Sequence, residues 1–207
     1  DGFEVVLHRE ALEPGKVVEI IIGGRAIAGA HTDAGFDTSQ GRFYVKLSSD
    51  GKLRYYFGSA DGSFATEEAS TNPVSLLDGD GNDKWTHIAI TYTHGDTGEF
   101  RLYVDGVEDV GGSRSFTNPV GIGSNVSVGA YQFSNTGFTH TFDGQLDQLK
   151  VWNVALTGPQ IAESRDSWGS NYGNEEITGQ ASNLVALFDF NEGSGTTLFN
   201  RVDNSKH

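Results

Sequence analysis

The sequence predicts an all-β protein, a two-sheet antiparallel sandwich of jelly-roll type with one short helix. Apolar and polar residues alternate over 85–92 and again over 100–106, with a polar, glycine-bearing turn at 94–99 between them. This pattern is typical of an antiparallel hairpin with one buried face. Similar short runs follow one another along the chain, and only one segment carries helix signals. Together these features favour a double sheet.

The remaining strands are expected in order along the chain. The runs 3–8, 42–48 and 52–58 alternate, whereas 17–22 is apolar on both faces, as in a strand covered on both sides. Asp50-Gly51 and Asp105-Gly106 supply tight turns. Strands are also expected at 126–130, 148–152 and 184–190. The alternation places these side chains in the core: Trp85, Ile88, Ile90, Leu102, Val104, Val128, Leu149 and Val151.

The helix signals lie at 157–164. Thr157 suits an N-cap, and Pro159 fits the first helical turn because its missing N–H has no partner there. The Gly-, Asn- and Ser-rich stretch 167–182 predicts an exposed loop.

Composition excludes several function classes. The 207 residues carry 28 acidic against 14 basic side chains, a net charge of −14, which opposes nucleic acids and anionic lipid surfaces and favours cations. The chain has no cysteine, so disulfides, thiol chemistry and cysteine-bound zinc are excluded. No apolar run approaches the ~18 residues that a transmembrane helix needs, so direct membrane insertion is not expected.

Two blocks carry a family resemblance. One joins W-T-H-I-A-I-T-Y at 85–92 to G-E-F-R-L-Y-V-D-G at 98–106, and the other is F-D-G-Q-L-D-Q-L-K-V-W-N-V-A-L-T at 142–157. Both resemble laminin-G-like and pentraxin-like domains of the concanavalin A-like lectin/glucanase group. With the weaker segment 41–58, the resemblance covers residues 1–165. It implies a jelly-roll scaffold with a helix after the second block, and fold alone does not define function.

The run 184–197, L-V-A-L-F-D-F-N-E-G-S-G-T-T, resembles the opening strand of many bacterial laminin-G-like repeats. Two interpretations follow. Residues 1–207 form a single laminin-G-like domain that 184–207 closes as an outer strand and tail, or 184–207 begins a following module. The first is favoured because an unpaired apolar strand is prone to aggregation. Both imply covalently linked neighbouring domains in a modular parent chain.

Catalysis is not expected. Glycosidases on this scaffold place carboxylates on one strand face in a Glu-x-Asp-x-x-Glu arrangement, and no such motif is present. Glu67-Glu68 and Glu175-Glu176 are adjacent pairs and are expected to be solvated loop charges. Neither a Gly-x-Ser-x-Gly elbow nor an HExxH spacing occurs.

Calcium is the expected cofactor, with two competing loop sites. Asp78 and Asp80 belong to D-G-D-G-N-D, which has oxygen ligands at alternate positions but lacks the glycine and glutamate of an EF-hand. The resemblance implies instead a rim of several loops near Asp33, Asp37 and Asp61. The pentraxin-like acidic cluster is missing, because Tyr131-Gln132-Phe133 stands in its place. This leaves room for one ion held by Asp37 and backbone carbonyls.

Ligand contact is expected on a loop at 131–141, because aromatic and amide side chains on a rigid scaffold suit sugar or peptide recognition. The alternative is that its phenylalanines pack into the core. The expected contact residues are His31, Tyr131, Gln132, Phe133, Asn135 and His140.

The sequence thus predicts a non-catalytic, secreted or cell-surface binding module of a bacterial adhesin. Its partner would be an extracellular glycan or another cell-surface ligand, bound with or without calcium. One alternative is a structural spacer without a ligand of its own. Another is the accessory carbohydrate-binding domain of a polysaccharide-degrading enzyme.

Overall fold

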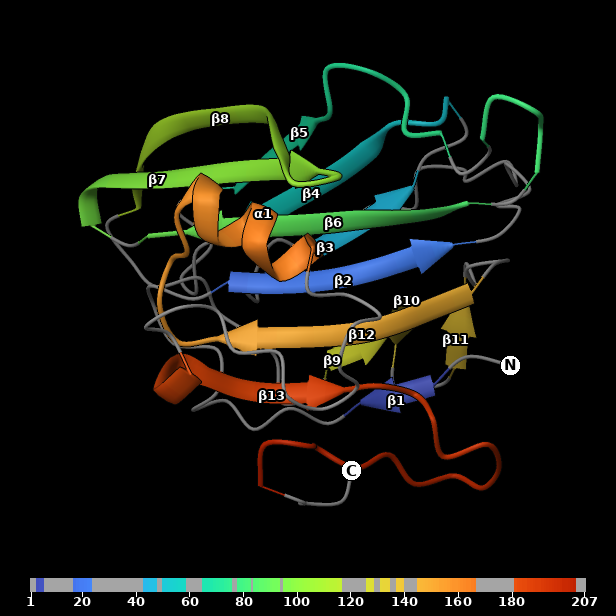
Figure 1. The fold of residues 1–207 in the computed structure, drawn as a ribbon. Helices are drawn as coiled ribbons and strands as arrows, with labels where there is room; N and C mark the ends of the chain where they lie inside the picture. The colour runs from blue at the N-terminus through green and yellow to red at the C-terminus, as the bar shows by residue number, and fades with distance from the viewer. Residues whose placement is uncertain are drawn as a thin grey trace.

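The computed structural model describes residues 3–5, 17–23, 43–47, 50–58, 65–75, 78–82, 84–93, 95–116, 126–128, 131–134, 137–139, 145–166 and 181–203. These residues form an antiparallel β structure with one α-helix (Figure 1). The predicted all-β sandwich is confirmed. None of the described helices is long and apolar enough to cross a membrane.

The largest sheet has six antiparallel strands in the order β13-β12-β2-β6-β7-β8. Its strands are β2 (Val17–Gly23), β6 (Trp85–Tyr92), β7 (Gly95–Val104), β8 (Val107–Phe116), β12 (Gln145–Trp152) and β13 (Leu184–Phe188). The last strand follows a short 3-10 turn, η2 (Ala181–Asn183). Strands from both ends of the sequence therefore meet in one sheet, since β2 lies between β12 and β6.

A second layer lies behind this sheet (Figure 1). It contains the three-stranded sheet β3 (Phe43–Leu47), β4 (Leu53–Gly58) and β5 (Ala65–Ala69). Two further antiparallel pairs are β1 (Phe3–Val5) with β9 (Val126–Val128) and β10 (Tyr131–Ser134) with β11 (Gly137–Thr139). The layers are also joined by hydrogen bonds, because Thr86 Oγ1 donates to Ser75 O at 3.1 Å.

The helix α1 (Gly158–Asp166) lies across the front of the six-stranded sheet (Figure 1). Thr157 lies before its first residue, and its backbone N–H and hydroxyl both contact Gln160 Oε1 at 2.9 Å. Ile161 of α1 packs with Ala89, Tyr103, Trp152 and Leu156. Tyr103 and Trp152 thus belong to a second apolar layer, between the sheet and α1.

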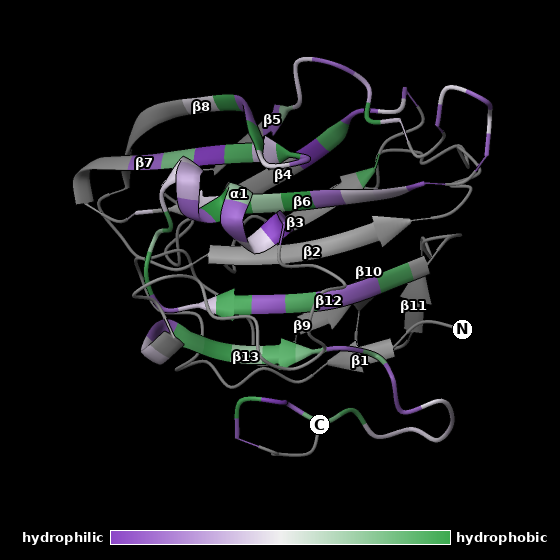
Figure 2. Ribbon diagram, in the orientation of Figure 1, coloured by the Kyte–Doolittle hydropathy of each residue, from purple (hydrophilic) through white to green (hydrophobic). Residues whose placement is uncertain are grey.

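The other face of the sheet points to the second layer and carries the alternating apolar set. Ile88, Ile90, Leu102, Leu149 and Val151 are all buried, as predicted. Figure 2 shows β13 hydrophobic along its length, whereas β7 alternates between hydrophilic and hydrophobic residues. Strand β6 is therefore covered on both faces, because His87, Ala89 and Thr91, which point to the face opposite Ile88 and Ile90, are buried as well.

Three core and turn predictions need correction. Trp85 is 36% exposed and Val104 is only half-buried, because both lie at the sheet end where cover is incomplete. The predicted turn at 94–99 is mostly strand, since β7 begins at Gly95. The tight closure is held by Thr93, whose N–H donates to Glu99 O at 2.8 Å. Val128 belongs to β9, and its side chain lies outside the described structure.

Strands β5 and β8 and the β10–β11 hairpin were not expected. Glu67 and Glu68 lie on β5 rather than in a loop, and the predicted loop 131–141 contains the paired segments of β10 and β11. Strand β8 contains Gly111 and Gly112, which do not favour a strand, yet it pairs with β7 over its length. These polar or glycine-containing segments become strands through their partners, since β propensity depends on tertiary context.

Candidate ligand-binding site

The chain after β13 folds back along the outer edge of that strand. Asn200 Oδ1 accepts a hydrogen bond from Leu187 N at 3.0 Å, and Asn200 Nδ2 donates to Val185 O at 3.2 Å. Arg201 N donates to Leu187 O at 2.8 Å. Leu198 is buried in the cluster of Leu149, Val151, Ala186 and Phe188. Backbone pairing and apolar packing together therefore hold residues 189–203 against the six-stranded sheet.

An ion cluster forms within this returning segment. Arg201 Nε donates to Asp189 Oδ2 at 2.9 Å, and its Nη2 lies 2.9 Å from Asp189 Oδ1 and 3.7 Å from Glu192 Oε1. Burial acts to raise the pKa of Asp189, but the hydrogen bonds from Arg201 and Asn191 outweigh it and hold that pKa below its ordinary value. Asp189 and Glu192 are nearly covered, with side chains 11% and 12% exposed.

A pocket of about 440 Å³ opens beside this cluster. It is lined by Glu192, Phe199, Arg201 and the small residues 194–197. Glu192 Oε1 accepts from Phe199 N at 3.0 Å, while Glu192 Oε2 is buried and has no hydrogen-bond partner. Gly193 (φ 71°) and Gly195 (φ 102°) adopt the left-handed conformation that lets the segment turn around the pocket.

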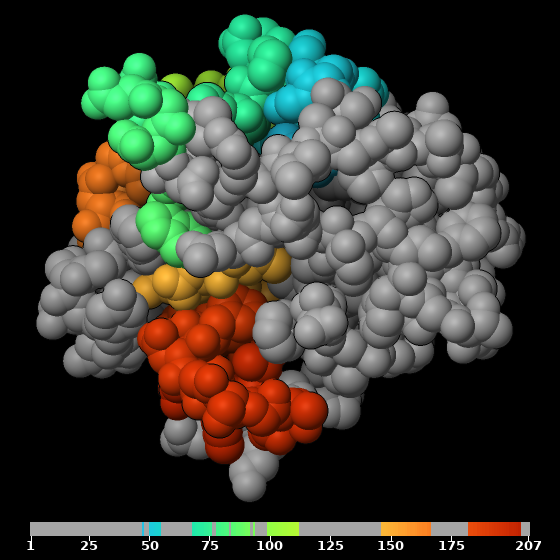
Figure 3. Space-filling model, turned by 90° about the vertical axis from the view of Figure 1, so that its right-hand side faces the viewer, coloured from blue at the N-terminus to red at the C-terminus, as the bar shows by residue number. Residues whose placement is uncertain are grey.

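The chemistry of this pocket suits a polyhydroxylated ligand. The hydroxyls of Ser194, Thr196 and Thr197 can both donate and accept hydrogen bonds, and Glu192 adds a carboxylate to the lining. Phe199 adds an aromatic surface for the apolar face of a sugar ring. The size falls within the usual range for small-molecule sites. Figure 3 shows the C-terminal segment at the surface, beside the start of β12.

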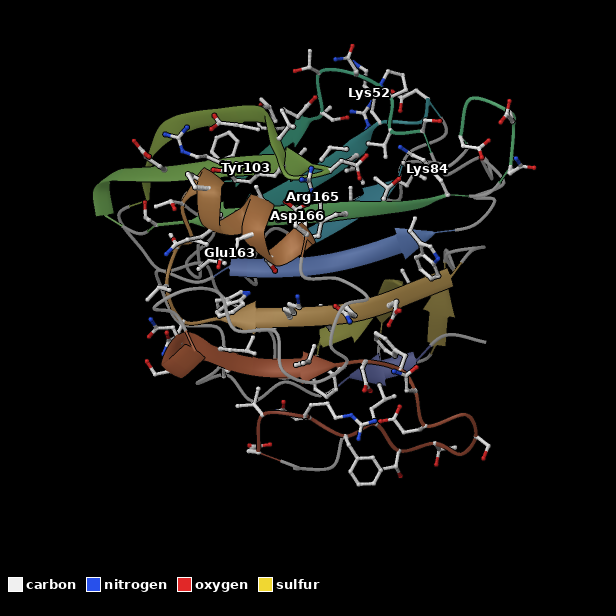
Figure 4. The ribbon with its side chains drawn as sticks, viewed as in Figure 1. Lys52, Lys84, Tyr103, Glu163, Arg165 and Asp166 are labelled. Atoms are coloured by element: carbon white, nitrogen blue, oxygen red, sulfur yellow. The ribbon has the colours of Figure 1, made fainter. Side chains whose placement is uncertain are left out.

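A second exposed surface lies at the start of β6. Trp85 is its partly exposed aromatic residue, and Lys84 Nζ beside it lies 3.2 Å from Asp105 Oδ2. Asp105 Oδ1 also accepts from His87 N at 3.0 Å, which ties this strand end to the β7–β8 turn. Figure 4 shows Lys84 near one end of the sheet, away from the C-terminal segment. This surface has an aromatic ring but no enclosing pocket among the described residues.

A buried polar layer lies between the sheet and α1. Lys150 Nζ donates to Ser164 Oγ at 3.2 Å, and Lys150 and Ser164 are only 2% and 1% exposed. His87 is 5% exposed, and neither ring nitrogen has a hydrogen-bond partner. Burial, together with the nearby Lys150 charge, lowers the pKa of His87 to about 4. Serine, lysine and histidine are the residue types of a nucleophilic site, but α1 covers them, so this layer does not provide an open catalytic centre.

The carboxylates on β5 do not form a hydrolytic pair. Glu67 and Glu68 pair with Tyr56 and Tyr55 of β4 and are consecutive strand positions, which belong to opposite sheet faces. The geometry of two carboxylates directed at one glycosidic bond is therefore missing from β5.

Of the predicted metal ligands, the structure describes Asp78 and Asp80. Their loop is exposed, and Asp78 Oδ1 accepts from Asp80 N at 2.9 Å and Asn82 N at 2.8 Å. Hydrogen bonds from the backbone and side chain of Asn82 lower the pKa of Asp78. Within the described part of the chain, no three His, Cys, Asp or Glu residues converge on one point, so Asp78 and Asp80 do not by themselves complete a metal site.

The other predicted residues are only partly placed. Tyr131, Gln132 and Phe133 lie on β10, where Tyr131 pairs with Thr139 and Gln132 with Phe138. The remaining predicted ligands lie outside the described residues: His31, Asp33, Asp37, Asp61, Asn135 and His140. The pocket residues were not among the expected contacts. The available signal was the run G-S-G-T-T at 193–197, which comes shortly after the apolar run 184–190.

Solved structures with a similar fold include a protein from Bacteroides ovatus with an inferred carbohydrate-binding role. It has a TM-score of 0.60 and 15% identity, and the match covers all of this chain and 55% of that protein, so this chain spans about half its length. The CBM40 module of the Ruminococcus gnavus IT-sialidase, bound to α2,3-sialyllactose, matches with a TM-score of 0.55 and 12% identity. That match covers 78% of this chain and 90% of the module.

The ligand-binding domain of botulinum neurotoxin serotype D, in complex with N-acetylneuraminic acid, has a TM-score of 0.52 and 11% identity. The match covers 81% of this chain and 40% of that one. No curated protein matches the sequence. At these identities the likeness shows the fold alone. A family model does match residues 25–162, two thirds of the sequence, which contain both blocks of the family resemblance. The chain therefore belongs to the Laminin_G_3 family of the concanavalin A-like lectin/glucanase superfamily.

Proposed function

We propose that this protein is a non-catalytic glycan-binding module. The pocket beside β13 carries the proposal, because it combines three hydroxyl side chains, an aromatic ring and a carboxylate. A sugar offers hydroxyl donors and acceptors at its rim and an apolar ring face, so each of these groups has a complementary partner.

Family and fold support the same function. The family belongs to a lectin/glucanase superfamily, and two of the similar structures contain sialyllactose or N-acetylneuraminic acid. These ligands belong to those proteins and do not specify the sugar for this chain. They indicate that this scaffold can accommodate carbohydrate.

The absence of catalysis is part of the proposal. Hydrolysis of a glycosidic bond requires two carboxylates on opposite sides of that bond. Glu192 lines the pocket and accepts from Phe199 N through Oε1, and Asp189, beside the pocket, is held by Arg201. These carboxylates have structural partners, so the pocket is suited to binding.

The rim residues of the sequence prediction supply additional contacts in this proposal. They are His31, Tyr131, Gln132, Phe133, Asn135 and His140, with calcium at Asp33, Asp37 and Asp61 or at Asp78 and Asp80. We propose a secreted or cell-surface location in a bacterial adhesin. An accessory domain of a polysaccharide-degrading enzyme is the second candidate, favoured by the likeness to a sialidase module.

A glycan array tests the function directly. The purified chain is applied with calcium and with chelator, and a Thr196→Val/Phe199→Ala variant is tested beside it. Reproducible binding to a defined glycan class, weakened in the variant, supports the proposal. If no glycan binds in either condition, the result favours the spacer alternative. Release of reducing sugar from a bound polysaccharide would contradict the non-catalytic part.

A further inference from the structure

The pocket beside β13 has a defined charge balance. Its ion cluster contains two carboxylates, Asp189 and Glu192, and one guanidinium, Arg201, which leaves one net negative charge. The hydrogen bonds that hold the pKa of Asp189 below its ordinary value keep this carboxylate ionised at neutral pH. Of these three residues, Glu192 and Arg201 line the pocket, so the excess negative charge comes from Asp189 beside it, on a protein whose net charge is already −14.

Arg201 is the cation of this pocket, and its hydrogen-bonding fork is already engaged. Nε and Nη2, one bidentate edge of the guanidinium, both face Asp189 at 2.9 Å. The same Nη2 lies 3.7 Å from Glu192 Oε1. A ligand carboxylate that approached this edge would displace Asp189 and would lie beside Glu192. This edge of Arg201 thus holds the protein segment and is not available to an anion.

Glu192 provides the opposite preference. Its Oε2 atom is buried without a hydrogen-bond partner, while Oε1 accepts from Phe199 N. The Glu192 side chain is nearly covered, at 12% exposed, so it acts on a ligand through its charge rather than through a direct hydrogen bond to Oε2. A neutral sugar hydroxyl is not repelled by this charge, whereas an ionised carboxylate or sulfate on a ligand is.

We infer that this pocket selects uncharged sugar units and disfavours acidic ones, an inference that rests on the proposed glycan-binding function. The hydroxyls of Ser194, Thr196 and Thr197 complete the recognition of neutral hydroxyl groups. The selectivity differs from that of the similar structures that hold sialylated or sialic acid ligands. Fold similarity does not transmit ligand charge, because charge preference depends on the residues of the site.

Paired glycans measure this selectivity. The probes are neutral oligosaccharides, each with its sialylated counterpart, beginning with lactose and α2,3-sialyllactose, and binding is followed by calorimetry at low and high salt. The neutral member of a pair should bind about tenfold more tightly at low salt, because repulsion between like charges in a partly exposed site has this order of magnitude. The ratio should decrease at high salt as the charges are screened.

Two variants locate the effect in this pocket. Glu192→Gln retains an oxygen for Phe199 N but removes one negative charge, so the preference for the neutral member should decrease severalfold. Thr196→Val removes a hydroxyl and should weaken both members without changing their ratio. Glu163→Gln on α1 removes an equal charge at a site away from the C-terminal segment (Figure 4) and is the matched control, with the ratio unchanged.

The outcomes separate the two proposals. If the sialylated member binds as tightly as the neutral one, the inference is wrong and the glycan-binding function stands. If a neutral preference persists unchanged in Glu192→Gln and affinity persists in Thr196→Val, the selectivity does not arise in this pocket and the inference is again wrong. If no pair binds at all, the proposed function fails and the inference fails with it.

Discussion

Asn200 hydrogen-bonds to the backbone of Leu187 and thereby covers the outer edge of β13. Its Oδ1 accepts from Leu187 N at 3.0 Å and from Val202 N at 3.1 Å, while its Nδ2 donates to Val185 O at 3.2 Å. The Asn200 side chain, together with Arg201 N hydrogen-bonded to Leu187 O at 2.8 Å, therefore takes the place of a neighbouring strand. Because unpaired strand edges promote association between molecules, Asn200 protects the end of the sheet as well as positioning the pocket.

Replacing Asn200 with alanine should lower the free energy of unfolding by about 1–3 kcal/mol, because buried backbone groups of β13 lose their partners. Asn200→Asp keeps an acceptor for Leu187 N but loses the donor to Val185 O, so it should also destabilise. Urea unfolding measures both effects. Asn153→Ala, at an exposed position, is the control and should remain near wild type.

Gly106 allows α1 to approach the β7–β8 turn. Asp105 (φ 49°) and Gly106 (φ 75°) form this turn, and a Cβ on Gly106 would lie 3.3 Å from Ala162 Cα and 3.2 Å from Arg165 Nη1. Gly106→Ala should therefore destabilise by more than the roughly 1 kcal/mol expected for a left-handed position alone.

The matched control is Gly81→Ala. Gly81 has a similar φ of 83°, but a Cβ there meets nothing within 4 Å. Both unfolding free energies are measured in the presence of a chelator. The difference between the two losses of stability reports the cost of the contact between the new Cβ and α1. Equal destabilisation by both changes would show that the turn does not limit the position of the helix.

Because the pKa of the buried His87 imidazole is lowered, we expect the protein to lose stability in mild acid. Its folded pKa of about 4 lies below the ordinary value of 6.5, so the unfolded chain binds more protons between these pH values. The stabilising contribution is therefore complete above pH 6.5 and is lost as the pH falls towards 4, by about 3 kcal/mol in total.

The charged groups around His87 do not cancel the effect of burial on its pKa. Lys150 and Arg165 oppose its protonation, and Asp105 and Asp166 only partly offset them. An NMR titration of the imidazole in the folded protein should give a midpoint near 4. A midpoint near 6.5, or unfolding free energies that remain constant between pH 6.5 and 4.5, would contradict this assignment.

Calcium should raise the melting temperature of the protein if the predicted loops bind the ion in the folded state and not in the unfolded chain. At one hundred times the dissociation constant, the gain is about 2.7 kcal/mol. Magnesium should have a smaller effect because it requires octahedral geometry. Melts in calcium, magnesium and chelator measure the response.

Asp37→Ala and Asp78→Ala distinguish the two expected calcium sites. The calcium response, rather than the starting melting temperature, is the quantity to compare, because Asp78→Ala also removes the hydrogen bonds to Asp80 and Asn82. The rim prediction expects a loss of response with Asp37→Ala. No shift in wild type, or an intact response in both variants, would contradict the calcium prediction.

Much of the fold could be predicted from sequence. Period-two alternation fixed β6, much of β7 and β12, because successive side chains of a strand point to opposite faces. Asp105-Gly106 was recognised as a turn because few residues other than glycine adopt its left-handed conformation readily. The helix was found from Thr157 and Pro159, although α1 extends to Asp166. These are local signals, and each depends on neighbouring residues in the chain.

The candidate site depends on contacts that no local pattern contains. Trp85 lies on the same face of β6 as His87, yet it is partly exposed at the end of the strand, whereas His87 and Lys150 are buried because α1 lies over the sheet. The pocket exists because residues 189–203 return along β13 and bring Arg201 to Asp189. Sequence periodicity determines which residues share a face, but only tertiary packing decides which faces are covered and which distant charges meet.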